Sequence, residues 1–225
     1  MIYQDRRAAG RILAEAVQRA IRARPDLGPA VVLGLPRGGV PVAFEVAKAC
    51  GFPLDVLVVR KLGAPGQREL AMGAIASDGT VVLNRDILRE LRIREETLQT
   101  AMRREQEDAQ MQERIYRQGR APVPMEGRTA ILVDDGLATG ATMRAAVRAV
   151  RAHAGRVVVA VPVGAGEACN DLTQEADLMI CPYAPLSFGA VGQFYQSFGP
   201  TSVQEVCNLL EQAQWEESTP RAAGA

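Results

Sequence analysis

Two adjacent carboxylates, Asp134 and Asp135, stand where an apolar run gives way to a loop of small residues. Carboxylates at such a point accept hydrogen bonds from sugar hydroxyl groups, or they bind a hydrated divalent cation such as Mg²⁺. They would repel a phosphate group in direct contact, so a phosphate bound nearby must be held by other groups. The pair therefore predicts a ligand that carries hydroxyls or a metal ion, and both roles stay open at this point.

The segment that follows the acids has the composition of a phosphate-binding loop. Its residues are Gly136, Leu137, Ala138, Thr139, Gly140, Ala141 and Thr142. The backbone N–H groups of such a loop and the positive end of the helix after it attract an anion. Thr139 and Thr142 add hydroxyl donors, while Gly136 and Gly140 let the backbone approach the anion without an intervening Cβ. We expect this segment to bind a phosphate group.

A turn with the sequence PRGG follows the apolar run at residues 30–35. Arg37 offers a planar fork of donors to phosphate oxygens, and Gly38 and Gly39 expose their backbone N–H groups. Taken alone, a turn of this composition is equally typical of an ordinary surface loop.

Two cations, Arg60 and Lys61, end a second apolar run at residues 54–60. At a strand exit they are placed to reach an anionic ligand, although the solvated end of a strand carries the same residue types. Residues 61–70 contain two glycines and a proline and are predicted to form a mobile loop.

The composition excludes several classes of protein. The chain has 225 residues, 48% hydrophobic and 23% charged, and its 26 basic residues equal its 26 acidic residues. It therefore has no overall basic field to attract nucleic acid or an anionic membrane. Four scattered cysteines and one histidine do not match zinc-site spacing. No signal peptide or membrane-length apolar run is found, so we expect a cytoplasmic protein.

Apolar runs alternate with amphipathic segments, which is typical of a parallel α/β sheet with right-handed crossovers. Buried strands are predicted at residues 30–35, 54–60, 129–133, 157–163 and 178–181. Helices are predicted at residues 5–24, 40–50, 140–153, 167–175 and 203–214. A hairpin is predicted around Asp78-Gly79, and one or two helices in the charged stretch at residues 85–118. In a parallel sheet, the loops after the strands meet at the carboxyl edge, where ligands of open α/β folds bind.

The sequence VDDGLATGAT, residues 133–142, resembles the phosphoribosyl diphosphate (PRPP) binding motif of the type I phosphoribosyltransferases. With Ala138, the loop is most similar to that of adenine phosphoribosyltransferase. The resemblance implies that Asp134 and Asp135 hold the ribose hydroxyls as catalytic residues and that residues 136–142 bind PRPP. It also implies a Mg²⁺ cofactor, which the two acids would contact through water.

Two other segments match the family's arrangement. The PRGG turn stands where the family has its pyrophosphate loop, so Arg37, Gly38 and Gly39 are implied to bind PRPP. The sequence VVRKLGAPG is similar to the family's strand that ends in Arg-Lys before a flexible loop. Arg60 and Lys61 are therefore implied to act on the pyrophosphate, with a loop at residues 61–71 closing over the site.

The resemblance covers about residues 30–165 and implies a doubly wound, mostly parallel α/β sheet of phosphoribosyltransferase type I. We expect a single domain over residues 1–215. A helical insert is expected at about residues 85–120, a small C-terminal hood at about residues 183–200, and a disordered tail at residues 216–225.

Five of the ten aromatic residues fall in the predicted hood: Tyr183, Phe188, Phe194, Tyr195 and Phe198. They would either stack on a planar acceptor base or form a hydrophobic seam that packs the C-terminal segment on the core. Phe188 and Tyr195 are the candidates for acceptor binding, and both alternatives stay open.

The sequence predicts an enzyme that transfers ribosyl 5-phosphate from PRPP to a nitrogen acceptor, with release of pyrophosphate. Its partners would be PRPP and a small acceptor molecule, and a homodimer is left open. A PRPP or nucleotide sensor of the same fold is the alternative, and a hydrolase acting on phosphosugars is a third. The 6-oxopurine enzymes of the family often have an acid where this chain has Ala138, so hypoxanthine and guanine are expected to be poor acceptors.

Overall fold

The computed structural model describes residues 1–218, leaving aside the side chains of residues 68, 69 and 215–218. At its centre lies a five-stranded sheet in the order β2-β1-β6-β7-β8. The strands are β1 (Ala30–Gly34), β2 (Leu54–Val56), β6 (Thr129–Val133), β7 (Arg156–Ala160) and β8 (Leu178–Ile180). All neighbouring strands are parallel, which confirms the predicted class of fold.

The strand order reverses direction between β1 and β6. The chain runs from β1 outward to β2, and then returns to the other side of β1 to build β6, β7 and β8. Such a switch point opens a crevice beyond the carboxyl ends of the two strands. The loops after β1 and β6, which carry the PRGG turn and the acid pair, both begin there.

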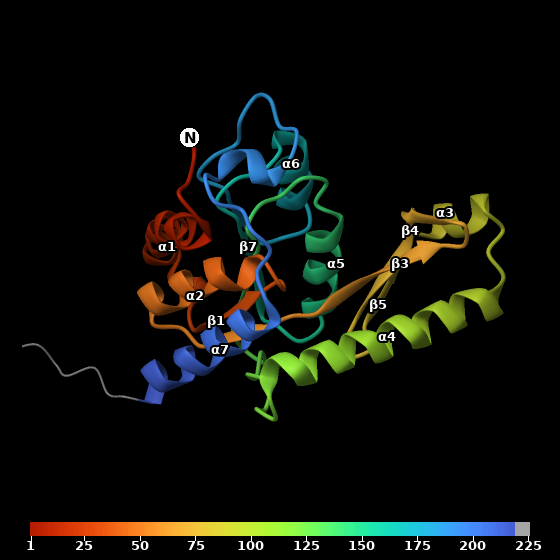
Figure 1. The fold of residues 1–225 in the computed structure, drawn as a ribbon, viewed down its shortest axis with the longest axis horizontal. Helices are drawn as coiled ribbons and strands as arrows, with labels where there is room; N and C mark the ends of the chain where they lie inside the picture. The colour runs from red at the N-terminus through yellow and green to blue at the C-terminus, as the bar shows by residue number, and fades with distance from the viewer. Residues whose placement is uncertain (219–225) are drawn as a thin grey trace, which may run out of the picture.

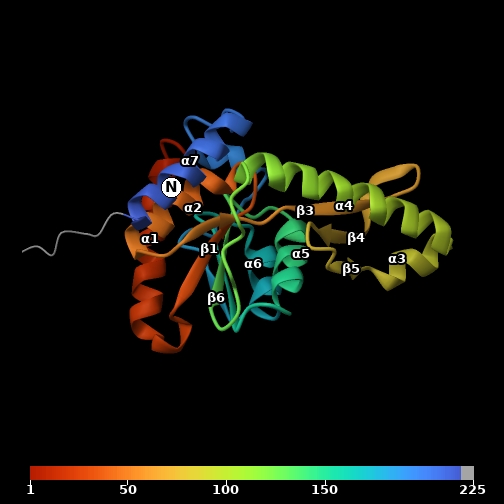
Figure 2. The same cartoon turned by 90° about the horizontal axis from the view of Figure 1, so that it is seen from below.

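Helices cover both faces of the sheet, as Figures 1 and 2 show. One face packs against α1 (Arg6–Ala23), α2 (Gly39–Cys50) and α7 (Val203–Ser218). The other face packs against α5 (Ala141–Val150) and α6 (Gly166–Thr173). β1 and β6 are buried along their whole length because both of their faces are covered, which explains why their sequences are almost entirely apolar.

A second, antiparallel sheet extends away from the central one (Figure 1). It consists of β3 (Val59–Ala64), β4 (Gln67–Ala76) and β5 (Val81–Leu83). Together with α3 (Arg85–Glu90) and α4 (Glu95–Arg117) it forms a projection, residues 59–117, that we call the arm. The arm has its own apolar cluster around Leu62, Met72, Ile75 and Leu98.

The mobile loop predicted at residues 61–70 is wrong, because these residues form the β3–β4 hairpin. Ala64 pairs with Gln67 across the turn, and Gly66 has a φ of 75°, which a type II turn requires after proline. The glycines and proline thus shape a hairpin. The predicted strand at residues 54–60 is divided, since β2 ends at Val56 and β3 begins at Val59 in the other sheet.

The remaining elements follow the predictions closely. The Asp78-Gly79 turn joins β4 to β5, and α3 and α4 occupy the predicted helical insert. The predicted disorder of the tail is wrong for residues 216–218, which belong to α7, while residues 219–225 lie outside the described part. Among the described residues, no helix is long and apolar enough to cross a membrane.

The N-terminal residues of the chain pair with the segment that follows Phe194. The Tyr3 N–H donates to the Phe194 carbonyl at 2.8 Å, and the Gln196 N–H donates to the Tyr3 carbonyl at 2.8 Å. Asp5 then caps α1 by accepting from the Ala8 N–H at 2.8 Å. These contacts fix the first turn of α1 beside the residues that follow Phe194.

Candidate ligand site at the carboxyl edge of the sheet

The loops after β1 and β6 lie against each other. A Cβ on Gly39 would lie 2.6 Å from the Val133 carbonyl oxygen and 2.8 Å from Asp134 Cα. A Cβ on Gly38 would lie 2.8 Å from the carboxyl carbon of Asp135. Both approaches are shorter than real Cβ contacts. Gly39 faces backbone atoms that cannot move aside, so that position requires glycine, whereas a side chain at position 38 would force the Asp135 carboxylate to shift. The structure therefore brings the PRGG turn and the acid pair together.

Both acids are in surroundings that disfavour their charged forms. Burial raises the pKa of Asp134 well above its ordinary value, and the neighbouring charge of Asp135 raises it further. Burial also raises the pKa of Asp135, against the opposing effect of Arg6. Oδ1 of Asp134 accepts the Asp135 N–H at 2.8 Å. Hydroxyl donors or a hydrated cation would stabilise such a pair, so both predicted roles are compatible with the geometry.

Arg6 is a site residue that the sequence analysis missed. Its Nε donates to Oδ2 of Asp135 at 2.8 Å, and its Nη1 donates to the Gly199 carbonyl at 2.6 Å. The guanidinium carbon also lies 4.0 Å from the centre of the Phe198 ring. Arg6 and Asp135 are 129 residues apart, so no local motif connects them.

One weak signal of this role was present in the sequence. Arg6 and Arg7 open a helix whose first turn contains no acidic residue. Positive charge is unfavourable at a helix N-terminus, so a cation there suggests a partner from elsewhere in the fold.

The loop after the acids is anchored at one residue and exposed at the next two. The Leu137 N–H donates to the Val163 carbonyl at 2.9 Å, and the Leu137 carbonyl accepts from the Ala165 N–H at 2.8 Å. Ala138 and Thr139 are exposed. Gly140 has a φ of 72° and leads directly into α5.

The first N–H groups of α5 have no acceptor within the helix, as at every helix N-terminus. These groups belong to Ala141, Thr142 and Met143. The Ala141 N–H has only a long contact of 3.5 Å with Oγ1 of Thr139. The loop and helix therefore present amide and hydroxyl donors of the kind that bind phosphate.

The three predicted cations have different surroundings. Arg37 is exposed on the PRGG turn. Burial raises the pKa of Tyr116 on α4, and the positive charge of Arg37 opposes that rise. Lys61 is exposed on β3 and lines a cavity described below.

Arg60 forms its ion pairs within the arm in this structure. Its Nε donates to Oε2 of Glu105 at 2.9 Å, and its Nη2 lies 3.5 Å from Oδ2 of Asp108. Both acids belong to α4. The structure therefore pairs Arg60 with α4 and not with the loops at the switch point, and its contact with pyrophosphate stays a prediction that requires these ion pairs to open.

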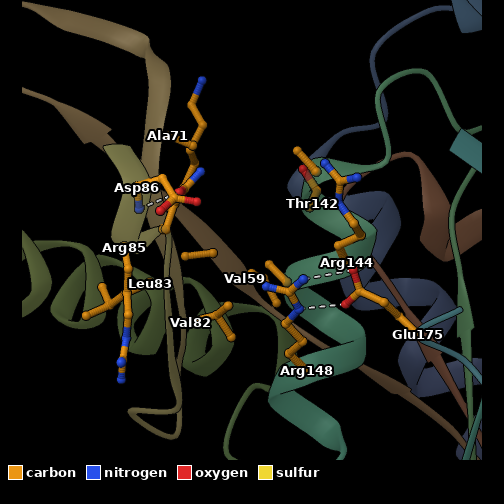
Figure 3. Close-up of a pocket in the computed structure, with 16 residues that line it drawn as sticks. Val59, Ala71, Val82, Leu83, Arg85, Asp86, Thr142, Arg144, Arg148 and Glu175 are labelled. Atoms are coloured by element: carbon orange, nitrogen blue, oxygen red, sulfur yellow. Dashed lines mark hydrogen bonds and ion pairs between the residues drawn. The ribbon is translucent and has the colours of Figure 1, made fainter. Parts of the chain in front are cut away.

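A cavity of about 460 Å³ separates the arm from α5 (Figure 3). Thr142 and Lys61 both line it, so the start of α5 and the predicted catalytic lysine share one space. Arg148 binds Glu175 on the α5 side with two hydrogen bonds of 2.6 and 2.8 Å. Figure 3 shows Val82 and Leu83 on the opposite wall.

The aromatic residues of the predicted hood form a packed seam. Phe188 lies 5.1 Å from Phe194 between ring centres, and Tyr195 lies 5.6 Å from Tyr3 and 5.0 Å from Phe198. The Tyr195 hydroxyl donates to the backbone carbonyl of Asp135 at 2.5 Å. Of the two alternatives, packing is what this structure contains, and the seam also supports the acid pair. Acceptor stacking by Phe188 and Tyr195 stays a prediction.

The side chains around the acid pair show how the expected Mg²⁺ ion could be bound. Among the residues that the structure describes, no group of three or more His, Cys, Asp or Glu side chains is placed to hold a metal ion. Mg²⁺ keeps several waters and typically binds one or two carboxylates together with substrate phosphates. Asp134 and Asp135 therefore fit a Mg²⁺ ion that arrives on a diphosphate, and they do not form a complete metal site alone.

The chain is similar to known proteins along nearly its whole length. The family model of the phosphoribosyl transferase domain matches residues 2–180. A Mycobacterium tuberculosis H37Rv protein named "Putative phosphoribosyl transferase Rv0571c" is 46% identical over 213 residues, which are 94% of this chain and 47% of that protein. The protein "Putative phosphoribosyl transferase MT0597" from Mycobacterium tuberculosis strain CDC 1551 has the same identity and the same coverage. The chain thus spans about half the length of these curated relatives.

A solved structure agrees over the full fold. The crystal structure of TT1426 from Thermus thermophilus has 42% sequence identity and a TM-score of 0.82, and the match covers 94% of this chain and 99% of that one. The family match supports the resemblance read from residues 133–142, and it includes every strand of the central sheet. The chain therefore belongs to the phosphoribosyl transferase domain family.

Proposed function

We propose that the chain transfers the ribosyl 5-phosphate group of PRPP to a nitrogen acceptor and releases pyrophosphate. The contact of the PRGG turn with the acid pair carries this proposal, because it creates one site flanked by two anion-binding loops. PRPP has an anionic group at each end of a ribose that bears two hydroxyls. It is therefore the kind of ligand that such a site accommodates.

Each group in the site has a role in binding. Asp134 and Asp135 accept hydrogen bonds from the ribose hydroxyls. The N–H groups and hydroxyls of residues 138–142 hold the 5-phosphate. Arg37, Gly38 and Gly39 bind the pyrophosphate. Arg6 holds the Asp135 side chain in place through its hydrogen bond to Oδ2.

The reaction breaks the bond between the anomeric carbon and a pyrophosphate oxygen and forms a carbon–nitrogen bond to the acceptor. Positive charge develops on the ribose ring as pyrophosphate departs, and the carboxylates of Asp134 and Asp135 stabilise that charge. Mg²⁺, when bound, neutralises the pyrophosphate. Lys61 adds positive charge to the leaving group once the arm moves toward the loops. That movement also excludes water, which would otherwise hydrolyse the sugar.

A base-dependent pyrophosphate assay tests the proposal. The protein is incubated with PRPP and Mg²⁺, with and without a panel of purines, pyrimidines and simple heterocyclic amines, and PRPP binding is measured separately by calorimetry. Release that requires a base supports transfer. Tight PRPP binding without release for any base would instead support the sensor, and release without a base the hydrolase. Absence of PRPP binding by the folded protein at millimolar concentration would overturn the proposal.

An Asp135→Asn variant serves as the site control in that assay. Asp26→Asn is its matched partner, because Asp26 is an exposed acid before β1 whose ion pairs with Arg24 and Arg156 lie away from the loops of the site. If the site carries out the transfer, the first variant should lose base-dependent pyrophosphate release and the second should release pyrophosphate like the wild type.

A further inference from the structure

Two of the four cysteines lie together beneath the loop that follows β6. Cys169 is buried on α6, and Cys181 is partly buried just after β8. Their sulfurs lie 2.5 Å and 3.4 Å from one point, the position that a Cβ on Gly164 would occupy. The absence of a side chain at Gly164 leaves the space that the two sulfurs share.

The two thiols are unequal partners. Contact with Cys181 lowers the pKa of Cys169, whereas the same contact and burial raise the pKa of Cys181 above its usual range. The Cys181 thiol also lies 3.3 Å from the Tyr183 carbonyl, to which it donates. Cys169 is therefore the thiol that loses its proton more readily, and the Cys181 sulfur lies close enough to react with it.

The other two cysteines lack this arrangement. Cys50 on α2 and Cys207 on α7 belong to the opposite face of the central sheet. Burial raises the pKa of Cys50 to about 11, and the Cys207 thiol donates to the Ile115 carbonyl at 3.4 Å. They provide internal controls for any chemistry of the pair.

We propose that Cys169 and Cys181 form an intramolecular disulfide when the protein meets a hydroperoxide. Cys169 is 8% exposed, so a small oxidant of this class fits the access that the site allows. The proposal does not depend on ribosyl transfer, since it concerns only these two side chains.

The chemistry proceeds in two balanced steps. The Cys169 thiolate attacks one oxygen of hydrogen peroxide, so that a sulfur–oxygen bond forms, the oxygen–oxygen bond breaks, and hydroxide leaves and takes up the thiol proton as water. The Cys181 sulfur then attacks the sulfenic sulfur of Cys169. The sulfur–sulfur bond forms as the sulfur–oxygen bond breaks, and the hydroxyl leaves as water with the Cys181 proton. The two thiols lose two electrons and the peroxide gains them.

The pair also lies close to the proposed phosphate loop. Cβ of Leu137 is 3.2 Å from the same point beside Gly164. Ala168, the neighbour of Cys169 on α6, lies 3.6 Å from the position of a Cβ on Gly140. A disulfide would therefore form in direct contact with residues that hold the start of α5.

Mass spectrometry of the intact folded protein tests the proposal. The wild type is treated with hydrogen peroxide near neutral pH, unfolded, alkylated at its remaining thiols and mapped by peptide. We expect two thiols to resist alkylation, a peptide that links Cys169 to Cys181, and recovery of both thiols after reduction. Oxidation that leaves both cysteines alkylatable, or that links them to Cys50 or Cys207 instead, would overturn it.

Serine variants test the order of the two steps. Cys181→Ser is expected to stop at the sulfenic acid of Cys169, which dimedone traps, and Cys169→Ser is expected to react at least tenfold more slowly at Cys181. Cys50→Ser and Cys207→Ser should form the disulfide at the wild-type rate. Trapping of a sulfenic acid at Cys181 but not at Cys169 would contradict the assigned roles. The wild-type peptide map decides the main proposal even if a variant folds poorly.

Discussion

Nε of Arg6 lies 2.8 Å from Oδ2 of Asp135, and this ion pair ties the first turn of α1 to the acid pair at the end of β6. The Arg6 and Asp135 side chains are only 13% and 14% exposed. An arginine at a helix N-terminus is unfavourable by about 0.3–1 kcal/mol, and the contact with a buried carboxylate offsets that cost. The same guanidinium holds the Gly199 carbonyl, so Arg6 joins three distant segments around Asp135.

Replacing Arg6 by Gln should destabilise the fold, because it leaves the Asp135 carboxylate without its cation. We expect a loss of roughly 2 kcal/mol, between the values for exposed and fully buried ion pairs. Arg7→Gln is the matched control, since Arg7 is 44% exposed and pairs with Glu45 at 3.2 Å. Urea unfolding of both variants measures the difference. Equal losses would show that the Arg6 contact contributes no more than a surface ion pair.

Asp135→Asn should weaken the binding of every ribose 5-phosphate compound, including ribose 5-phosphate itself. The amide keeps the shape of the side chain but replaces one acceptor oxygen with a donor, so a ribose hydroxyl loses its partner. Calorimetry with ribose 5-phosphate should show a loss of about tenfold or more, corresponding to roughly 1.4 kcal/mol. Inorganic phosphate, which has no hydroxyl-bearing sugar, provides the comparison ligand. A variant that binds ribose 5-phosphate as the wild type does would remove Asp135 from the site.

Lys61→Ala should mainly slow turnover and leave PRPP binding close to that of the wild type. Pyrophosphate gains charge as it departs, so a lysine that acts on it contributes more in the transition state than in the bound substrate. Lys48→Ala on α2 is the control, because Lys48 is exposed near a helix end and does not line the cavity between the arm and α5. Steady-state kinetics separate kcat from KM. A rise in KM with unchanged kcat would assign Lys61 to binding alone.

Gly39→Ala should separate the two loops of the site. The added Cβ would meet the Val133 carbonyl at 2.6 Å and Asp134 Cα at 2.8 Å, and both are backbone atoms of β6 and its exit. We expect a loss of about 1–3 kcal/mol in stability, as for other overpacked positions, together with weaker PRPP binding. Gly166→Ala, at the start of α6, is the control because a Cβ there meets nothing within 4 Å. Thermal unfolding that is unchanged by Gly39→Ala would contradict the close approach.

The parts of the fold that the sequence predicted are those determined by local pattern. Residues 129–133 form β6 with the predicted bounds, because a short run that is almost entirely apolar between charged segments is typical of a buried strand. The order of acids, small residues and helix in residues 134–142 is equally local. The hairpin of β3 and β4 was not predicted, because Pro65 and Gly66 are as typical of loops as of tight turns.

The contacts that complete the site depend on the tertiary fold. Arg6 reaches Asp135 only because Tyr3 pairs with the segment after Phe194 and so places α1 beside the acid pair. Arg60 was predicted from its position at a strand exit, but that strand turns into the arm, where Glu105 offers a nearer partner. Neither relationship leaves a periodic or spacing signal in the chain.

Hypoxanthine and guanine should be poor acceptors, because the loop after the acid pair carries Ala138 where an acid would assist protonation of a 6-oxopurine. Ala138 is exposed, so the base would meet a methyl group and backbone there. A missing proton-transfer partner reduces rate by about 10²-fold or more, which makes the contrast measurable. Adenine, or a non-purine heterocycle, should therefore react faster than either 6-oxopurine when all are assayed side by side with PRPP and Mg²⁺. Ala138→Asp should reduce the difference in rate between the 6-oxopurines and the other bases, whereas Ala152→Asp, an exposed position just past the other end of α5, should leave that difference unchanged. If guanine or hypoxanthine reacts ten times faster than every other base with the wild type, the argument from Ala138 fails.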